Sequence, residues 1–292
     1  MSIVVDVLSK LSHDNSGSLK FLHKTVSNWH GVMLLLTGTT TSLDVKLRNG
    51  KSYHVEVMDE YVVADYKKRK LKFHYSTKEE KIHAILMLIG EFFDEPHSEL
   101  DVKNRNVVDI GAYIADTAIY FALNGAKHVY ALEPYPYSYE LAKKNVALND
   151  LERKITMMNA GAGSKNSTIK IKTDYKNLAG SELGHSESSG KKIPIMSLDY
   201  IAKKYKLNDA ALKIDCEGCE YDMILKSKSE TLQRFRKILI EYHYDYPKLE
   251  NKLKECGFKV RHTEPEHMKN ANTKKQEMYG GTIFAELHKK GY

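Results

Sequence analysis

Hydrophobic and polar residues alternate on both sides of an Asn-Gly pair in the segment 43–57, LDVKLRNGKSYHVEV. Apolar residues occupy every second position before and after Asn49-Gly50. Such alternation is typical of a half-buried strand, and Asn-Gly accepts the positive φ angles of a two-residue type I′ turn. The segment therefore predicts a β-hairpin.

A helical pattern follows over residues 78–93, where apolar residues recur at a spacing of three and four. Thr77, with Glu80 three residues later, fits a capping box at its start. The polar segment 94–106, which contains Pro96, comes next. We therefore expect a small α+β domain over residues 1–100 and a second domain over residues 101–292.

From Val107 onward, short apolar segments alternate with helical stretches. We expect strands at 106–110, 128–132, 154–158, 211–215, 237–242, 258–262 and 282–287. This order predicts an α/β fold with a doubly wound, mainly parallel sheet. Ligands of such sheets bind beyond the carboxyl ends of the strands. The segment 178–192, rich in Ser and Gly, predicts a flexible loop able to cover such a site.

The composition is that of a globular protein, with 292 residues, 42% of them hydrophobic and 28% charged. The longest apolar run, 32–36, is too short to span a bilayer, and the first residues lack the pattern of a secretory signal. Three cysteines do not suggest a disulfide framework, which favours the cytoplasm. The net charge of +7 is interpreted as scattered lysines, with attraction to nucleic acid as the alternative.

Two carboxylates end the first two strands of the expected sheet. Asp109 ends the first strand, Gly111 permits a tight turn, and a helix begins near Ala115 or Asp116. Glu133 ends the second strand, 24 residues beyond Asp109. An acidic residue at this place accepts the ribose hydroxyl hydrogens of an adenosine. Singly, Asp109 is equally well a helix N-cap and Glu133 an exposed strand end, but together they favour a nucleotide site.

The turn after the first strand favours a cationic nucleotide. It lacks the G-x-G-x-x-G pattern that presents amide groups to a pyrophosphate, which disfavours an NAD-linked oxidoreductase. The carboxylate of Asp109 would repel a pyrophosphate and attract the ammonium and sulfonium charges of S-adenosylmethionine. Tyr113 and Tyr135 offer aromatic faces to a cation, unless they only pack.

Polar residues also follow the later strands. Asn159 and Ala160 follow the third strand, where an amide would meet an adenine edge. Further on, Asp215, Glu217 and Glu220 follow the fourth strand, and the fifth contributes Glu241 and His243. Together these side chains suit a general base or a divalent metal site. In the alternative interpretation, Glu217 and Glu220 are ordinary residues at a helix start, where the helix dipole favours acidic groups, and His243 is a core histidine.

The pair Cys216 and Cys219 forms a C-x-x-C pattern between two of these acidic residues. Only one further cysteine, Cys256, is present, so a four-cysteine site within one chain is excluded. We interpret the pair as small buried hydrophobic residues, in preference to a redox or zinc motif.

Three segments, VVDIGAYIADTAIYFALNGAKHVYALEPYPYSYELAKKNVALN, LKIDCEGCEYDMIL and ILIEYH, together resemble the FkbM-type family of S-adenosylmethionine-dependent methyltransferases. The resemblance covers about residues 107–258, and the paired cysteines and the E-Y-H-Y sequence are most similar to archaeal members. It implies a Rossmann-like methyltransferase sheet and O-methylation, commonly of sugars or hydroxylated natural products. Tyr113 stands where the family usually has Asn, and Ala115 where it usually has Gly.

The resemblance also implies roles for single residues. It places Asp109, Gly111 and Glu133 around the cofactor, Asn159 near adenine, and Asp215 and Glu217 where methyl donor and acceptor meet. The predicted catalytic residues are Asp215, Glu217 and His243. If Mg²⁺ takes part, its predicted ligands are Asp215, Glu217, Glu241 and His243. The full predicted cofactor site consists of Asp109, Gly111, Ala112, Tyr113, Asp116, Glu133, Pro134, Asn159, Ala160 and Asp215.

The expected acceptor is a small molecule or glycan, without membrane insertion. An RNA methyltransferase is the first alternative, but the acidic Asp-Cys-Glu-Gly after the fourth strand would repel a phosphate backbone. A non-catalytic S-adenosylmethionine-binding module is the second. Residues 1–100 are expected to act as an acceptor lid or an oligomerisation unit. Whether the chain forms a homo-oligomer is left open by the sequence.

Overall fold

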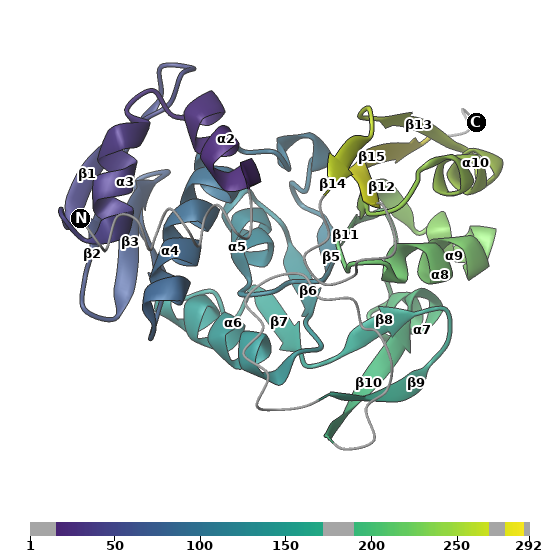
Figure 1. Cartoon of the computed structure of the whole chain (residues 1–292). Coiled ribbons are helices and arrows are strands. Elements are labelled where there is room, and N and C mark those ends of the chain that lie inside the picture. Colours follow the sequence, from purple (N-terminus) through teal and green to yellow (C-terminus); the bar gives the residue numbers. More distant parts are fainter. Residues whose placement is uncertain (1–15, 172–189, 269–277, 289–292) are drawn as a thin grey trace. The chain divides into compact units, whose positions relative to one another are not determined.

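The computed structural model describes residues 16–171, 190–268 and 278–288, and the chain divides into two compact units, Met1–His97 and Ser98–Tyr292 (Figure 1). Among the described residues, no helix has the length and apolar character needed to cross a membrane.

The first unit combines helices with a four-stranded antiparallel sheet in the order β1-β2-β3-β4. Its core includes buried apolar residues such as Leu35, Val55 and Phe73. Its elements are α2 (Ser16–Thr25), α3 (Trp29–Thr37), β1 (Ser42–Lys46), β2 (Ser52–Val57), β3 (Tyr61–Tyr66), β4 (Arg69–His74), α4 (Lys78–Met87) and the π-helical turn η1 (Leu88–Phe93).

The predicted hairpin is present, but its turn differs from the prediction. Leu47 and Lys51 are bonded across the loop, which leaves three residues between them. Gly50 has a left-handed φ of 87°, and Asn49 does not. The type I′ turn is therefore wrong, because a single left-handed glycine closes a three-residue loop instead. The predicted helix cap is confirmed, since Thr77 accepts the backbone N–H of Glu80 at 3.2 Å.

The second unit contains the expected α/β sheet. Its elements are η2 (Ser98–Leu100), β5 (Asn106–Ile110), α5 (Asp116–Leu123), β6 (His128–Leu132), α6 (Pro136–Leu148), β7 (Ile155–Met158), β8 (Gly161–Gly163), β9 (Ser167–Ile171), β10 (Lys191–Ser197), α7 (Leu198–Lys204), β11 (Ala210–Ile214), α8 (Cys219–Lys226), α9 (Ser229–Leu232), β12 (Phe235–Tyr242), α10 (Pro247–Glu255), β13 (Phe258–His262), β14 (Glu266–Met268) and β15 (Met278–Leu287).

The strand order of the main sheet is β13-β15-β12-β11-β5-β6-β7, with β14 paired to β15. The five strands from β12 to β7 are parallel, and β15 is antiparallel to both of its neighbours. The chain winds outward from β5 in one direction through β6 and β7, and in the other through β11 and β12. The predicted doubly wound, mainly parallel sheet is confirmed, and its switch point lies between β5 and β11.

The two faces of this sheet differ in character. Val108, Ile110, Leu212 and Ile214 belong to an apolar cluster that also takes in residues of α7, α8, α9 and α10. The residues between them, among them Asp109 and Lys213, point to the other face because successive side chains of a strand alternate. Polar groups of β5 and β11 therefore meet on one side of the sheet.

A second, three-stranded sheet of β8, β10 and β9 follows β7 and was not predicted. Its strand β8 has only three residues, and β9 begins with the exposed Ser167 and Thr168. In segments this short, without a run of apolar residues, the periodicity of hydrophobic residues is too weak to predict a strand. The predicted flexible loop at 178–192 lies mostly outside the described residues, while Lys191 and Lys192 belong to β10.

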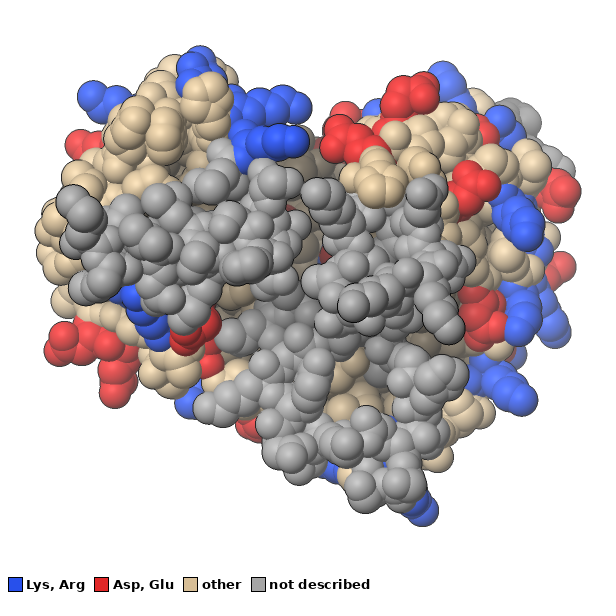
Figure 2. Space-filling model, in the orientation of Figure 1, with Lys and Arg blue, Asp and Glu red and all other residues tan. Residues whose placement is uncertain are grey.

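Charged side chains of both signs cover the surface of the second unit where it is visible. In Figure 2, lysines and arginines are interspersed with acidic residues over the part that carries β13, α8 and α10. On this face the net positive charge is spread out, as scattered lysines predict.

Candidate active site

A buried ion pair joins the two central strands of the sheet at the switch point. Asp109 of β5 has no exposed surface, and its Oδ1 lies 3.6 Å from Nζ of Lys213 on β11. The Thr117 hydroxyl donates to its Oδ2 at 2.7 Å. Lys213 and Thr117 thus both hold Asp109, and Lys213 compensates its charge, a contact that was not predicted.

Lys213 connects Asp109 to the candidate catalytic residue. Its Nζ donates to the backbone oxygen of Gly111 at 3.2 Å and lies 3.4 Å from Oδ2 of Asp215. Burial alone would lower the pKa of Lys213, but the charges of Asp215 and Asp109 outweigh it and raise the pKa. The lysine is therefore charged. In the sequence, the single lysine within the apolar segment ALKI could have indicated this buried charge.

The turn after β5 requires left-handed backbone at three positions. Gly111 has a φ of 78°, and a Cβ placed on it would lie 1.6 Å from the backbone oxygen of Asp215. Only glycine therefore lets the ends of β5 and β11 meet. Tyr113 and Ala115 also have positive φ angles, 45° and 68°. This explains why the resembling family favours Asn and Gly there, since these residues tolerate the left-handed region best.

Glu133 lies at the end of β6 and accepts a hydrogen bond from the turn after β5. Its Oε2 accepts the backbone N–H of Tyr113 at 2.9 Å, and its Oε1 accepts that of Tyr135 at 2.8 Å. The side chain is buried. Burial raises the pKa of Glu133 to about 8, against the opposing effect of these two N–H bonds and of Lys213.

The remaining residues predicted for the cofactor site follow the ends of β5, β6 and β7, and not all of them face the same side. Asn159 donates to the backbone oxygens of Glu133 and Pro134, each at 3.0 Å, so its amide nitrogen fixes the end of β6. The methyl group of Ala160 packs in the apolar cluster on the opposite side. The other three are buried, with Asp116 opening α5 and Ala112 and Pro134 within the turns after β5 and β6.

Asp215 and Glu217 follow β11 and are partly accessible, with 32% and 30% of their side chains exposed. The backbone N–H of Asp215 donates to the oxygen of Ile110, which aligns the ends of β5 and β11. Glu217 has a positive φ of 54° and Gly218 one of 113°, so the chain turns sharply before α8 begins.

His243 follows β12 and is almost completely buried, with 1% of the residue exposed. Its Nδ1 lies 3.0 Å from Oε1 of Glu220, which is fully buried. Its Nε2 lies 3.4 Å from Oε2 of Glu217 and 3.8 Å from Oδ1 of Asp215. Burial would lower the pKa of His243, but the hydrogen bond to Glu220 and the neighbouring carboxylates raise it to about 9. The predicted catalytic residues Asp215, Glu217 and His243 thus lie together.

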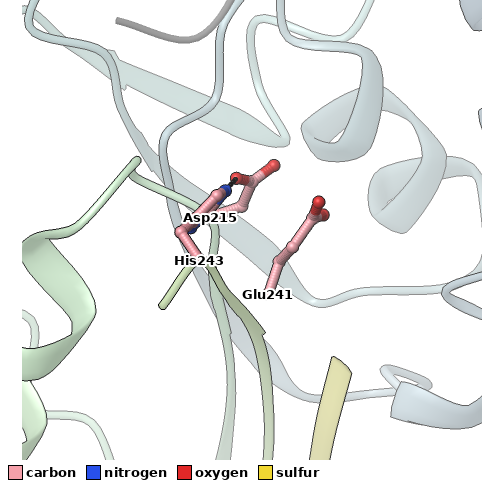
Figure 3. A group of neighbouring side chains, drawn as sticks. All are labelled: Asp215, Glu241 and His243. Carbon is pink, nitrogen blue, oxygen red and sulfur yellow. Dashed lines mark ion pairs between the residues drawn. The ribbon is translucent and has the colours of Figure 1, made fainter. Parts of the chain in front are cut away.

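Glu241 of β12 completes this group, which comes from two adjacent strand ends. One ligand atom each of Asp215, Glu241 and His243 lies within 4.8 Å of the others. Figure 3 shows the carboxylate of Asp215 next to the imidazole, with the carboxylate of Glu241 beside them. Of the four metal ligands predicted, three therefore form the group, and Glu217 contacts its histidine.

The two cysteines next to Asp215 and Glu217 differ from the prediction. Cys216 and Cys219 are half-buried and joined by a disulfide, with their Cα atoms 5.5 Å apart. The interpretation as two unlinked, buried hydrophobic residues is therefore wrong. The tight turn at Glu217 and Gly218 brings the two Cα atoms within the range that a disulfide spans.

Taken together, the carboxyl edge of the sheet carries two kinds of polar group. A buried glutamate beside a tight turn ends β6, and a cluster of partly exposed carboxylates with a buried histidine ends β11 and β12. The first arrangement can accept hydrogen bonds from hydroxyl groups. The second can take a proton or hold a cation.

Comparison with known proteins supplies a family for this arrangement. The model of the methyltransferase FkbM domain matches residues 109–260, just over half of the chain. The match begins at Asp109 and includes Glu133, Asp215 and His243.

Individual relatives cover shorter stretches or are more distant. A protein from Methanocaldococcus jannaschii, named as a putative protein N5-glutamine methyltransferase, is 34% identical over 82 residues, which are 28% of this chain and 38% of the relative. A tRNA methyltransferase structure of M. jannaschii shows 16% identity and a TM-score of 0.40, over 89% of this chain and 65% of that one. A precorrin-6y C5,15-methyltransferase of Geobacter metallireducens shows 16% identity and a TM-score of 0.38, over 65% and 85%.

Proposed function

The chain belongs to the FkbM methyltransferase family, and from that premise we propose that it transfers the methyl group of S-adenosylmethionine to a hydroxyl oxygen of a sugar, glycoconjugate or small metabolite. The chain is a methyltransferase, and the family implies S-adenosylmethionine as the donor. When bound, this cofactor supplies a methyl group on a positively charged sulfur. The nature of the acceptor is our proposal.

The environment of Glu133 fits an adenosine-containing cofactor. An ionised carboxylate has about four acceptor positions. Two of those on Glu133 are used by the N–H groups of Tyr113 and Tyr135. This leaves acceptor capacity for the two hydroxyl hydrogens of a ribose, on a side chain that the turn already holds in place. Asn159 would act beside it by fixing the end of β6.

We expect the affinity for adenosine ligands to rise with pH because of Glu133. Its pKa of about 8 in the folded protein means that the side chain is mostly neutral at pH 6. Since ribose hydroxyls bind best to the ionised form, the affinity should rise by up to about tenfold per pH unit below pH 8 and level off above it. Calorimetry with 5′-methylthioadenosine, which has no group titrating between pH 6 and 9, measures this directly.

Glu133→Gln is the control for this pH dependence. The variant should bind about as weakly as the wild type at pH 6 and should show no increase up to pH 9. Other charges near Glu133 are those of Asp109 and Lys213, which the variant leaves unchanged. A wild-type affinity that does not change with pH, or an equal increase in the variant, would refute the role of Glu133.

The position of Asp215 is the observation that carries the proposed transfer to oxygen. A hydroxyl must lose its proton as the new bond to carbon forms, and a positioned base assists that loss. Asp215 is partly exposed, directly follows β11 beside the turn after β5, and is held by Lys213. His243 is too deeply buried to contact an acceptor, so we assign it the positioning of Asp215 and Glu217.

A panel of acceptors incubated with methyl-labelled S-adenosylmethionine tests the proposal. We expect label in sugars or hydroxylated metabolites, in an ether linkage that resists alkaline hydrolysis. Label only in RNA or only in protein would overturn the proposed acceptor class while leaving the methyltransferase assignment intact.

Transfer to an amide nitrogen of a protein is the second candidate. The name of the M. jannaschii relative favours it, although that relative matches over only 28% of this chain. Against RNA as an acceptor, the partly exposed carboxylates of Asp215 and Glu217 follow β11, and the visible surface of the second unit mixes both charge signs. A non-catalytic binding module would show cofactor binding without label transfer to any acceptor class.

A further inference from the structure

We propose that Asp215, Glu241 and His243 bind a divalent cation of the Mn²⁺ or Mg²⁺ class at the carboxyl edge of β11 and β12. The site itself stands on geometry alone. Its consequence for catalysis rests on the proposed function, because the cation would activate the acceptor hydroxyl.

The three side chains come from two adjacent parallel strands and face the same space. Asp215 directly follows β11, Glu241 lies within β12 and His243 directly follows it. One ligand atom from each lies within 4.8 Å of the other two (Figure 3). Metal ligands bind at about 2.0–2.2 Å, so a cation between them requires only small side-chain movements. The partial exposure of Asp215 and Glu241 allows such movements.

The orientation of His243 is the second, independent observation. Its Nδ1 is occupied by the fully buried Glu220, which fixes the ring and turns Nε2 toward the carboxylates. Nε2 lies 3.4 and 3.8 Å from their oxygens, longer than an N–H···O hydrogen bond. A carboxylate on one ring nitrogen with the other nitrogen facing acidic residues is the arrangement that orients metal-binding histidines.

The two oxygens of Asp215 have separate partners. Oδ2 lies toward the ammonium of Lys213, and Oδ1 lies toward the imidazole of His243. A cation would therefore use Oδ1, on the side away from the lysine. Two carboxylates and one imidazole form a donor set in which oxygen predominates, which suits Mn²⁺ and Mg²⁺ better than a soft metal ion.

Binding of the cation would lower the pKa of a coordinated hydroxyl group. The acceptor oxygen would then carry negative charge before the methyl group arrives, and a carboxylate would receive the proton. The cation would also hold the acceptor beside the cofactor turn. Both effects would act on the acceptor oxygen, next to which the proposed function places Asp215.

Titration of the EDTA-treated 292-residue protein with Mn²⁺, followed by electron paramagnetic resonance, tests the site without the methyl donor. The pH is kept at 8, and the cation must displace the proton of the imidazole as it binds. We expect one bound Mn²⁺ per chain, displaced by excess Mg²⁺. Glu241→Gln should raise the Kd at least about tenfold, and Glu220→Gln about 10- to 100-fold through His243.

Glu140→Gln is the matched control, since it removes one exposed carboxylate on α6 that pairs with Lys143 of the same helix. It should leave the Kd for Mn²⁺ unchanged. If Glu220→Gln fails to fold, as judged by circular dichroism, the partly exposed Glu241→Gln decides alone. No binding by the wild type up to about 1 mM, or equal binding by Glu241→Gln, overturns the site.

Failure of the site and failure of the proposed function give different results. Methyl transfer to a hydroxyl acceptor that continues in EDTA refutes the cation and preserves the function. Stoichiometric Mn²⁺ binding that depends on Glu241, combined with no hydroxyl methylation in any acceptor, preserves the site and refutes the function.

Discussion

Asp215→Asn should lower kcat by about 10²- to 10⁴-fold, the range expected when a positioned base is removed. The Kd for S-adenosylhomocysteine should rise by much less, about tenfold at most, because the substitution removes one predicted cofactor contact and leaves Glu133 and the turn after β5 unaltered. Asparagine has nearly the same shape as aspartate and can still accept from Lys213, but it cannot take a proton. Single-turnover rates and calorimetry, measured on the same preparation, separate the two quantities.

Asp209→Asn provides the matched control for this substitution. Asp209 lies at the opposite end of β11, is more than half exposed and pairs with Arg105. It also has a left-handed φ of 52°, which Asn tolerates. Turnover should therefore stay near that of the wild type. Turnover that survives in Asp215→Asn would show that Asp215 is not the catalytic residue, whereas equal loss in both variants would point to a general effect on β11.

The position of the site could be predicted because two simple rules apply to this sheet. Parallel strands place their carboxyl ends at one edge, and side chains alternate between faces. Asp109, Asp215 and Glu241 occupy places that follow from these rules alone. The strands that carry them were predicted from short apolar runs, and the strand order confirms the doubly wound fold.

The contacts among these residues could not be predicted, because they depend on register. Lys213 lies opposite Asp109 in the parallel pairing of β5 and β11, and no pattern within either strand fixes that alignment. The same holds for the bond between His243 and Glu220, which joins residues 23 positions apart. The sequence therefore predicted the cluster of carboxylates, Glu220 among them, but neither the part of Lys213 nor the bond by which Glu220 orients His243.

Backbone conformation explains two further differences. Tyr113 and Ala115 adopt the left-handed conformation although they are not the Asn and Gly that favour it. This conformation costs roughly 1–2 kcal/mol per residue. Glu217 adopts a similar conformation and brings Cys216 and Cys219 close enough for their disulfide. Steric preferences of single residues predict none of these positions. The roles of residues 1–100 and of the predicted cofactor residues stay predictions.

Lys213→Met should destabilise the second unit by about 3–5 kcal/mol, the cost of leaving one member of a buried ion pair without its partner. Asp109 has no exposed surface, so water cannot replace the lysine. For a unit of this size, the melting temperature should fall by roughly 10 °C. Hydrogen exchange followed by mass spectrometry should show faster exchange in β5 and β11, which locates the effect at the switch point.

The double variant Asp109→Asn, Lys213→Met decides whether this loss comes from the unpaired charge. It replaces both charges by neutral groups, and the amide oxygen of the new asparagine can still accept from the Thr117 hydroxyl. We therefore expect it to regain most of the lost stability, because removing both members of a buried pair is often close to neutral. Lys226→Met, which breaks an exposed pair with Asp222 on α8, should cost less than about 1 kcal/mol. Additive losses in the double variant, or a wild-type melting temperature in Lys213→Met, would mean that the pair does not hold the switch point together.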